Sequence, residues 1–249
     1  MQVYVSRKYR AIYVRQPKSA SSTIMKSILR TLCEGKSPCD TDAFVKMWVE
    51  RITYRQWSEY FVFTVVRNPW TRAASAFTFM HEGFLFKKNE LHIGNNDPPT
   101  EKCSIPFLEF TMNSYALEAA CMKQECCAYI TNTREWAPGF ISLHIGDQAH
   151  SVFTASGKSM VDYIGRSEHM LEDWAEIIAH INTRENTTFP TDAAAVLNKQ
   201  NRGVDDSNCL GDSYARMYNT TTAENVARHY SVDVVRFGFV QPAPPLEHS

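Results

Sequence analysis

Several features are missing from this 249-residue chain, and each absence excludes a class of protein. No run of about 18 apolar residues occurs, so the sequence predicts no membrane-spanning helix. No Cys-x-x-Cys pair or zinc-finger spacing occurs, so we expect neither structural zinc nor any other metal. No basic stretch with interleaved aromatic residues is present, which argues against nucleic acid as a partner. The Gly-x-x-x-x-Gly-Lys-[Ser/Thr] loop of P-loop kinases and NTPases is absent as well.

The sequence leaves the compartment open. Its first residues lack the apolar core of a signal peptide, which fits a cytoplasmic protein or one whose targeting segment precedes this sequence. Cys33 and Cys39 flank a turn-rich segment and could be bridged, and the cysteines within 103–127 could hold another disulfide. Asn186 and Asn219 begin Asn-x-Thr sequons, which are used only in a secretory lumen. These features favour an oxidising compartment, although buried free thiols and chance sequons explain them too.

Charge is distributed unevenly along the chain. Residues 1–72 hold 13 Lys and Arg against 5 Asp and Glu, a net charge of +8, whereas the whole chain has a net charge of −1. A basic N-terminal third favours an anionic ligand, although a surface-charge gradient alone is common. With 44% hydrophobic residues, the chain can bury the core of one large domain.

Two stretches have the pattern of an anion-binding site. In each, a short apolar run (11–16 and 61–66) typical of a buried strand gives way to a turn and then to a helical pattern. A helix start presents unpaired backbone N–H groups and the positive end of a dipole, which favour phosphate-like groups. Lys18 adds an ammonium group to the first site, and Arg67 with Ser75 adds a guanidinium and a hydroxyl to the second. Two such sites indicate a ligand with separate anionic groups.

Apolar periodicity predicts an alternation of strands and helices along the chain. The predicted strands are 11–16, 61–66, 139–145 and 162–165; the predicted helices are 22–33, 42–51, a helix after Pro69, 107–113, 114–127, 168–182, 213–218 and 222–230. This alternation implies an α/β fold, a P-loop-type parallel sheet flanked by helices. We expect a single domain over 1–249, with 83–103 as a loop or insertion and 240–249 as a tail.

The motifs resemble those of the Golgi-type carbohydrate sulfotransferases, a family-2-like group that uses 3′-phosphoadenosine 5′-phosphosulfate (PAPS). Pro17-Lys18-Ser19-Ala20-Ser21-Ser22 is similar to the family's 5′-phosphosulfate loop, Pro-Lys-[Ser/Thr]-Gly-[Ser/Thr]-[Ser/Thr]. The run from Val66 to Phe77 is similar to its 3′-phosphate motif, Val-Arg-Asp-Pro-aromatic-x-Arg-x-x-Ser-Ala-aromatic.

Later landmarks agree with the resemblance: the His…Gln pair in 144–148, the Tyr-x-x-Gly-[Lys/Arg]-x-Glu pattern in 163–174, and the closing Tyr-x-x-Asp-x-x-x-Phe-Gly-aromatic segment in 230–239. Two residues depart from the pattern. Ala20 replaces a glycine, so the loop must avoid positive φ there or accept strain. Asn68 replaces an aspartate. This sequence also holds no counterpart of the family's membrane anchor.

The resemblance implies a role for each motif residue. Lys18 would stabilise charge on the bridging oxygen of the phosphosulfate, while Arg67 and Ser75 would hold the 3′-phosphate. Trp70 is expected to pack, and Arg72 to face solvent or an acidic neighbour. The predicted nucleotide-binding set is Pro17, Lys18, Ser19, Ala20, Ser21, Ser22, Thr23, Arg67, Ser75 and Arg166.

The general base is less well defined by the sequence, because residues 19–66 contain no histidine. An acceptor hydroxyl needs a histidine or carboxylate within hydrogen-bond reach. His144, at the end of a predicted strand, is slightly favoured over Glu50. Other candidates are Glu34, Asp40, Asp42, Glu59 and His81.

The expected function is transfer of a sulfuryl group from PAPS to an acceptor hydroxyl, with a carbohydrate as the expected acceptor. The alternative is a non-catalytic relative that binds PAPS, its product PAP (adenosine 3′,5′-bisphosphate) or a glycan. The expected location is the Golgi lumen or secretory pathway if an anchor precedes this sequence, and the cytoplasm otherwise.

Overall fold

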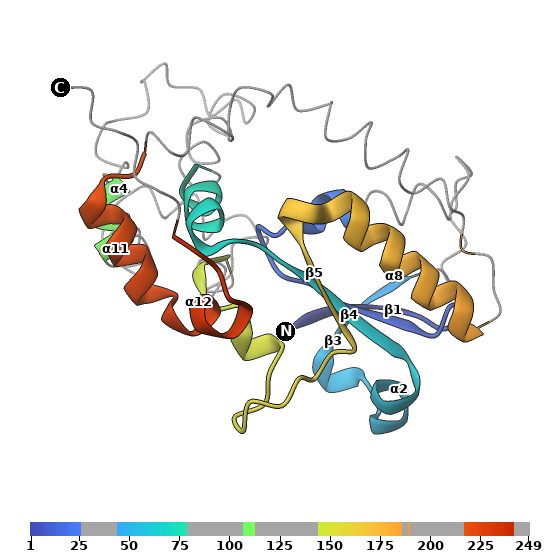
Figure 1. Ribbon diagram of the computed structural model, residues 1–249. Helices are drawn as coiled ribbons and strands as arrows, with labels where there is room; N and C mark the ends of the chain where they lie inside the picture. The colour runs from blue at the N-terminus through green and yellow to red at the C-terminus, as the bar shows by residue number, and fades with distance from the viewer. Residues whose placement is uncertain (26–43, 79–106, 113–143, 186–188, 190–216, 242–249) are drawn as a thin grey trace, which may run out of the picture. The chain divides into compact units, whose positions relative to one another are not determined.

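The computed structural model describes residues 1–25, 44–78, 107–112, 144–185, 189 and 217–241 (Figure 1). The chain divides into two compact units. The first comprises Met1–Asn68 and Gln148–Cys209, and the second comprises Pro69–Asp147 and Leu210–Ser249. Each unit is described by itself, and the predicted single domain stays a prediction.

The first unit is built on a mixed five-stranded sheet. Its strands are β1 (Gln2–Ser6), β2 (Ala11–Val14), β3 (Val45–Trp48), β4 (Phe61–Val66) and β5 (Tyr163–Arg166), in the order β3-β1-β2-β4-β5 (Figure 1). β2, β4 and β5 run parallel, whereas β1 is antiparallel to both β2 and β3. The α/β fold with parallel strands and flanking helices is therefore confirmed, and the antiparallel edge is an addition that the sequence did not predict.

The strand predicted at 61–66 lies inside the sheet as β4, between β2 and β5. All six residues of β4 are buried, which explains why this strand reads as a continuous apolar run rather than an alternation. Helix α8 (Met170–Glu185) covers one face and buries Trp174, Ile177, Ile178 and Ile181 against the sheet (Figure 1). Leu171, at the start of this helix, is 39% exposed.

The strand directions gather the carboxyl ends of four strands at one edge of the sheet. β2, β4 and β5 are parallel, and β3 runs the same way because β1 is antiparallel to both β2 and β3. In α/β sheets this edge is where ligands bind. The opposite end of β4 is preceded by the short helix α2 (Tyr54–Glu59), which begins with a Thr53–Gln56 capping box.

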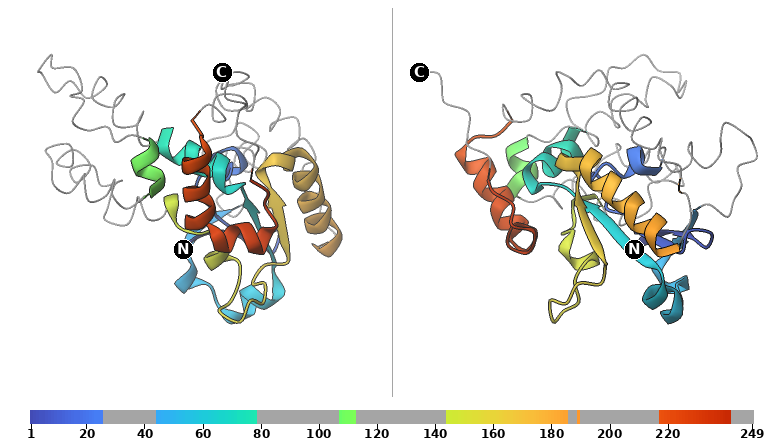
Figure 2. Two further views of the ribbon diagram at one scale, coloured as in Figure 1. Left: turned by 60° about the vertical axis from the view of Figure 1, so that its left-hand side comes forward. Right: turned by 45° about the vertical axis from the view of Figure 1, so that its right-hand side comes forward.

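The second unit is helical in its described residues. Residues 69–78 form a helix that begins at Pro69, a residue well suited to a first helical position. The other helices are α4 (Phe107–Met112), α11 (Thr220–His229) and α12 (Ser231–Phe237), and α11 packs against α4 (Figure 2). Asn219 caps α11 through a capping box with Thr222, and Gly238 ends α12 in the left-handed conformation.

Several predicted elements differ from the structure. The predicted helix 42–51 is instead β3 followed by the 3-10 turn η1 (Val49–Arg51), because exposed Lys46 and Trp48 occupy an edge strand that sequence periodicity resolves poorly. His144 and Ile145 are helical rather than the end of a strand. The 3-10 turns η3 (Ala149–Ser151) and η4 (Ser167–His169) were not predicted.

Some predictions lie outside the described residues. These are the helix 22–33 beyond residue 25, the loop 83–103, the helix 114–127, the strand 139–145 before residue 144, the helix 213–218 before residue 217, the tail from residue 242 and all the proposed cysteine pairs.

Candidate functional site

The first anion-binding loop follows β2 directly. After Gln16 and Pro17 the chain turns, and the Ser19 N–H donates to the Gln16 carbonyl at 3.3 Å. Residues 21–25 are helical, and the Ile24 N–H donates to the Ala20 carbonyl at 3.0 Å. The backbone N–H groups of Ser21, Ser22 and Thr23 therefore belong to a first helical turn, which has no intrahelical acceptors for them. The predicted strand–turn–helix arrangement is present at this loop.

The loop is held in a left-handed backbone conformation at two positions. Lys18 has φ +66° and Ala20 has φ +56°. The sequence left open whether the chain avoids positive φ at Ala20, and the structure shows that it does not. A residue with a Cβ costs about 1–2 kcal/mol in this region relative to its favoured conformations. Ala20 therefore holds a conformation that glycine would adopt without this cost.

The second predicted anion-binding loop begins at Arg67, directly after β4. The side-chain amide of Gln148 brackets Arg67: Oε1 accepts from the Arg67 N–H at 2.9 Å, and Nε2 donates to the Arg67 carbonyl at 2.8 Å. The next N–H, of Asn68, donates to Oε1 of Glu168 at 2.8 Å. The residue after the strand is therefore fixed by side chains rather than by a neighbouring strand.

The structure brings the two loops of the first unit together. Nη1 of Arg67 donates to the backbone carbonyl of Lys18 at 3.2 Å. The Ser19 hydroxyl donates to Oε1 of Gln148 at 2.7 Å, on the same oxygen that accepts the Arg67 N–H. Because β2 and β4 are adjacent parallel strands, this contact occurs at their common carboxyl edge.

Residues around the first loop brace it from both sides. Arg15 contacts the Ser21 hydroxyl at 3.4 Å through Nε and Oε1 of Gln2 at 2.5 Å through Nη1. Nε2 of Gln16 donates to the hydroxyl of Ser151, which in turn donates to the Gln148 carbonyl at 2.9 Å. These contacts fix the chain on either side of Lys18, whose side chain is half-buried.

Arg166, the predicted auxiliary contact, lies at the same edge of the sheet. It ends β5 opposite Val66 of β4, and its N–H donates to Oδ2 of Asp173. Gly165 is closely packed beside it: an added Cβ would lie 3.1 Å from the Cβ of Asp173 and 3.4 Å from Cγ2 of Val65, so these neighbours would have to shift. The motif's glycine therefore lets α8 approach the strand that carries Arg166.

Ser75, Trp70 and Arg72 belong to the helix 69–78 of the second unit. Ser75 is half-buried. Trp70 is 1% exposed and donates through Nε1 to the Ala223 carbonyl at 3.0 Å, so its predicted packing role is confirmed. Arg72 was expected to face solvent or an acidic neighbour; it is 1% exposed, so it does not face solvent.

The burial of Arg72 has identifiable partners. Its Nη1 donates to the Gly146 carbonyl at 2.7 Å, and its guanidinium lies 5.7 Å from the ring centroid of Tyr230. Carbonyl and aromatic contacts of this kind compensate for the lost hydration of a guanidinium. Sequence reasoning missed this because the partners lie more than 70 residues away.

The candidates for the general base lie in different parts of the structure. Glu50 lies in η1, directly after β3, and is exposed at the edge of the sheet that carries Lys18. Glu59 ends α2 at the opposite edge, where it pairs with Arg10 at 3.2 Å and Arg55 at 2.8 Å. His144 belongs to the second unit and is 5% exposed. Glu34, Asp40, Asp42 and His81 lie outside the described residues.

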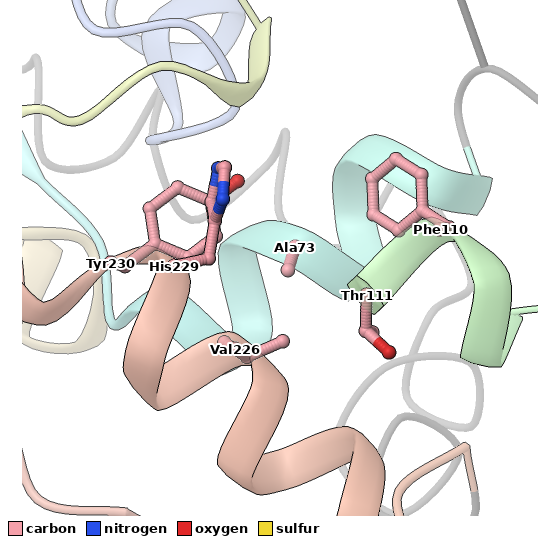
Figure 3. A pocket seen from close by; sticks show the side chains of 6 residues that line it. All are labelled: Ala73, Phe110, Thr111, Val226, His229 and Tyr230. Carbon is pink, nitrogen blue, oxygen red and sulfur yellow. The ribbon is translucent and has the colours of Figure 1, made fainter. Parts of the chain in front are cut away.

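A small pocket lies within the second unit (Figure 3). Its walls come from helix 69–78, α4, α11 and the residue that follows α11; they are formed by Ala73, Phe110, Thr111, Val226, His229 and Tyr230. None of the predicted site residues lines this pocket. Its mostly apolar walls do not suit a nucleotide with several phosphate groups.

No helix in the described part of the chain has the length and hydropathy needed to cross a bilayer. The same residues contain no group of three or more His, Cys, Asp or Glu side chains arranged to hold a metal ion.

The fold and the loops define a class of protein: an α/β protein in which a lysine-bearing loop and an arginine-bearing loop follow the carboxyl ends of adjacent parallel strands, the edge where α/β sheets bind ligands. The sulfotransferase family model matches residues 1–240. The chain belongs to the sulfotransferase family, and its recognition from the motifs as a family-2-like member is confirmed. It is an enzyme of the sulfotransferase type. No curated protein and no solved structure matches the chain.

Proposed function

We propose that this sulfotransferase uses PAPS as its donor and transfers the sulfuryl group to a hydroxyl of a carbohydrate. The observation that carries the proposal is the contact between the two loops, in which Arg67 donates to the Lys18 carbonyl at 3.2 Å. One nucleotide with anionic groups at both ends of its ribose needs two cationic loops at a single edge of the sheet.

The proposed binding mode assigns each loop to one end of the nucleotide. The 5′-phosphosulfate would lie on the turn Pro17–Ala20 and accept hydrogen bonds from the first N–H groups of the following helix, with the hydroxyls of Ser21 and Ser22 completing the cradle. Arg67 would hold the 3′-phosphate through its planar fork.

In the proposed reaction the acceptor oxygen attacks sulfur in line with the bond to the bridging oxygen. A new O–S bond forms, and the S–O bond to the phosphate breaks. The electron pair stays on the 5′-phosphate, and the acceptor proton passes to a general base. Lys18 would stabilise the charge that develops on the bridging oxygen, since positioning and electrostatic stabilisation dominate such group transfers.

The base stays a choice between two residues. Glu50 is exposed at the edge of the sheet that carries Lys18, which suits contact with an acceptor that arrives from solvent. His144 corresponds to the histidine of the family's His…Gln landmark. Replacing each with glutamine separates them, because only the loss of the base lowers the rate while PAP affinity is kept.

The carbohydrate acceptor and the compartment are parts of the proposal that rest on the motif resemblance. The sequons at Asn186 and Asn219 and the seven cysteines favour the Golgi lumen. Expression behind a secretory leader, followed by a test for N-glycans and disulfides, examines this part separately from catalysis.

The decisive experiment measures transfer from sulfur-labelled PAPS to a panel of sugars, polysaccharides and small alcohols. Wild type is expected to label a sugar, and Lys18→Ala is expected to lower kcat about a thousandfold. Lys158→Ala, an exposed turn lysine, is the matched control and should keep full activity. If wild type and Lys18→Ala both bind PAPS and neither transfers sulfate to any acceptor, the chain is a binding protein rather than a PAPS-dependent transferase.

A further inference from the structure

We infer that Gln148 is a positioning residue that couples the two nucleotide loops, so that the enzyme binds a nucleotide carrying both phosphates far better than either half of it. This inference rests on the proposed use of PAPS. Gln148 would not contact the reacting atoms; it would act through Ser19 and Arg67.

The hydrogen bonds of the Gln148 amide support this role. Oε1 accepts two bonds, from the Ser19 hydroxyl at 2.7 Å and from the Arg67 N–H at 2.9 Å. These two bonds use both acceptor positions of a carbonyl oxygen. Nε2 donates to the Arg67 carbonyl at 2.8 Å. Gln148 has no exposed surface, so water does not compete for these groups.

The geometry at Arg67 explains why an amide is needed there. A strand neighbour would accept from the backbone N–H and donate to the carbonyl of the same chain segment, and the Gln148 amide does both at a single residue. It thereby fixes the backbone of Arg67 one residue beyond the end of β4. No other neutral side chain of similar length offers a donor and an acceptor side by side.

The same amide also reaches the first loop. Ser19 lies between Lys18 and Ala20, both of which have positive φ, and is itself fully buried. Its hydroxyl is anchored to the oxygen that holds Arg67. The Gln148 carbonyl, through Ser151, also braces Gln16. A shift of either loop therefore disturbs hydrogen bonds of the other.

Coupling of this kind has a measurable signature. If the amide fixes the two loops relative to each other, binding of one phosphate also orders the loop that binds the second. A ligand with both phosphates then gains affinity from occupying both loops at once. Removal of the amide should affect a ligand that occupies both loops and largely spare ligands that occupy one. A residue that serves only the fold would lower stability without changing this ratio.

The experiment measures dissociation constants by calorimetry for PAP, 5′-AMP and 3′-AMP, with the complete chain. Gln148→Met keeps the length of the side chain and removes all three amide hydrogen bonds. We expect PAP affinity to fall about 30-fold and the affinity for either monophosphate to fall less than threefold. Gln56→Met is the matched control, because among the described residues the Gln56 amide bonds only to Thr53 of the capping box.

A second variant keeps the inference falsifiable if Gln148→Met folds poorly. Ser19→Ala removes only the bond to the first loop, and we expect it to weaken PAP binding about fivefold, again with little effect on the monophosphates. Equal losses for all three ligands, or no loss for PAP, overturn the inference. Failure of wild type to bind PAP at all refutes the proposed function instead, so the two failures are distinguishable.

Discussion

The guanidinium of Arg67 donates to the backbone carbonyl of Lys18 at 3.2 Å, across 49 residues of sequence. Arg67, which we propose binds the 3′-phosphate, thus also fixes the turn that carries Lys18. Because the carbonyl is a neutral acceptor, this contact does not cancel the charge of Arg67.

Arg67→Lys tests the importance of the planar fork. Lysine keeps the positive charge but cannot make paired parallel hydrogen bonds, so we expect the affinity for PAP to fall about 50-fold. The affinity for 5′-AMP should fall much less than that for PAP, because this ligand lacks the 3′-phosphate and is affected only through the lost contact with the Lys18 carbonyl. Calorimetric titration of both ligands measures the difference.

Arg55→Lys is the control for the Arg67 variant. Arg55 is exposed on α2 and pairs only weakly with the solvent-accessible Glu59, so its replacement should leave PAP binding unchanged. Equal affinity of Arg67→Lys and wild type for PAP contradicts the assignment of Arg67 to the 3′-phosphate.

Ala20→Gly tests the strain in the first loop. The strain at φ +56° costs about 1–2 kcal/mol for alanine, whereas glycine loses about 0.5–1 kcal/mol through its freer unfolded chain. We therefore expect the free energy of unfolding to stay unchanged or rise by up to about 1.5 kcal/mol. Denaturant unfolding followed by tryptophan fluorescence measures it.

The same exchange in an ordinary helix should have the opposite effect. Ala227→Gly, within α11, is expected to lower the free energy of unfolding by about 1 kcal/mol. If Ala20→Gly destabilises the protein as much as Ala227→Gly does, the left-handed conformation at Ala20 is refuted.

The parts of the fold that were predictable from sequence are those with strong local patterns. The unbroken apolar run of β4 predicted its bounds correctly at Phe61 and Val66. The stripe on α8 predicted the helix, since four of its apolar residues pack on the sheet. Both patterns arise from burial along one element, which sequence periodicity reports directly.

The features that escaped prediction depend on contacts between distant segments. β3 has mostly exposed side chains, and only its pairing with β1 makes it a strand. Gln148 joins loops that lie 129 and 81 residues away along the chain. The His…Gln landmark marked the position of Gln148, but nothing in its neighbourhood indicated what the amide would bind.

Arg72→Met tests the buried cation of the second unit. The substitution removes the hydrogen bond to the Gly146 carbonyl and the contact with the Tyr230 ring, while the methionine fills part of the space. We expect the free energy of unfolding to fall by about 3 kcal/mol, since charged hydrogen bonds and desolvated cation–π contacts each contribute about 1–3 kcal/mol. Arg228→Met, at an exposed position on α11, should change it by less than about 0.5 kcal/mol. Equal effects of the two variants contradict the buried placement of Arg72.

Tyr13→Phe tests the centre of the sheet. The Tyr13 ring stacks on Phe63 at 5.3 Å and is fully buried, and its hydroxyl has no hydrogen-bond partner among the described residues. An unsatisfied buried hydroxyl costs about 1 kcal/mol or more, so phenylalanine should raise the free energy of unfolding by about that amount at pH 8. Tyr54→Phe is the matched control, because Tyr54 is 89% exposed.

The increase in the free energy of unfolding caused by Tyr13→Phe should be larger at alkaline pH. Burial raises the pKa of Tyr13 above its ordinary value of 10.0, an effect that Arg15 opposes and Tyr4 increases. Above pH 10 the unfolded chain loses this proton while the folded protein keeps it, so wild-type stability is complete below pH 10 and falls as pH rises towards the folded pKa.

Burial and hydrogen bonds to Asp173 and Glu176 also raise the pKa of Tyr163, which adds to the decline in both proteins. Unfolding in urea at pH 8, 10 and 11 should therefore show a shallower decline for Tyr13→Phe, by up to about 1.4 kcal/mol per pH unit. Parallel declines for wild type and Tyr13→Phe would show that the phenol ionises as readily in the folded protein as in the unfolded chain.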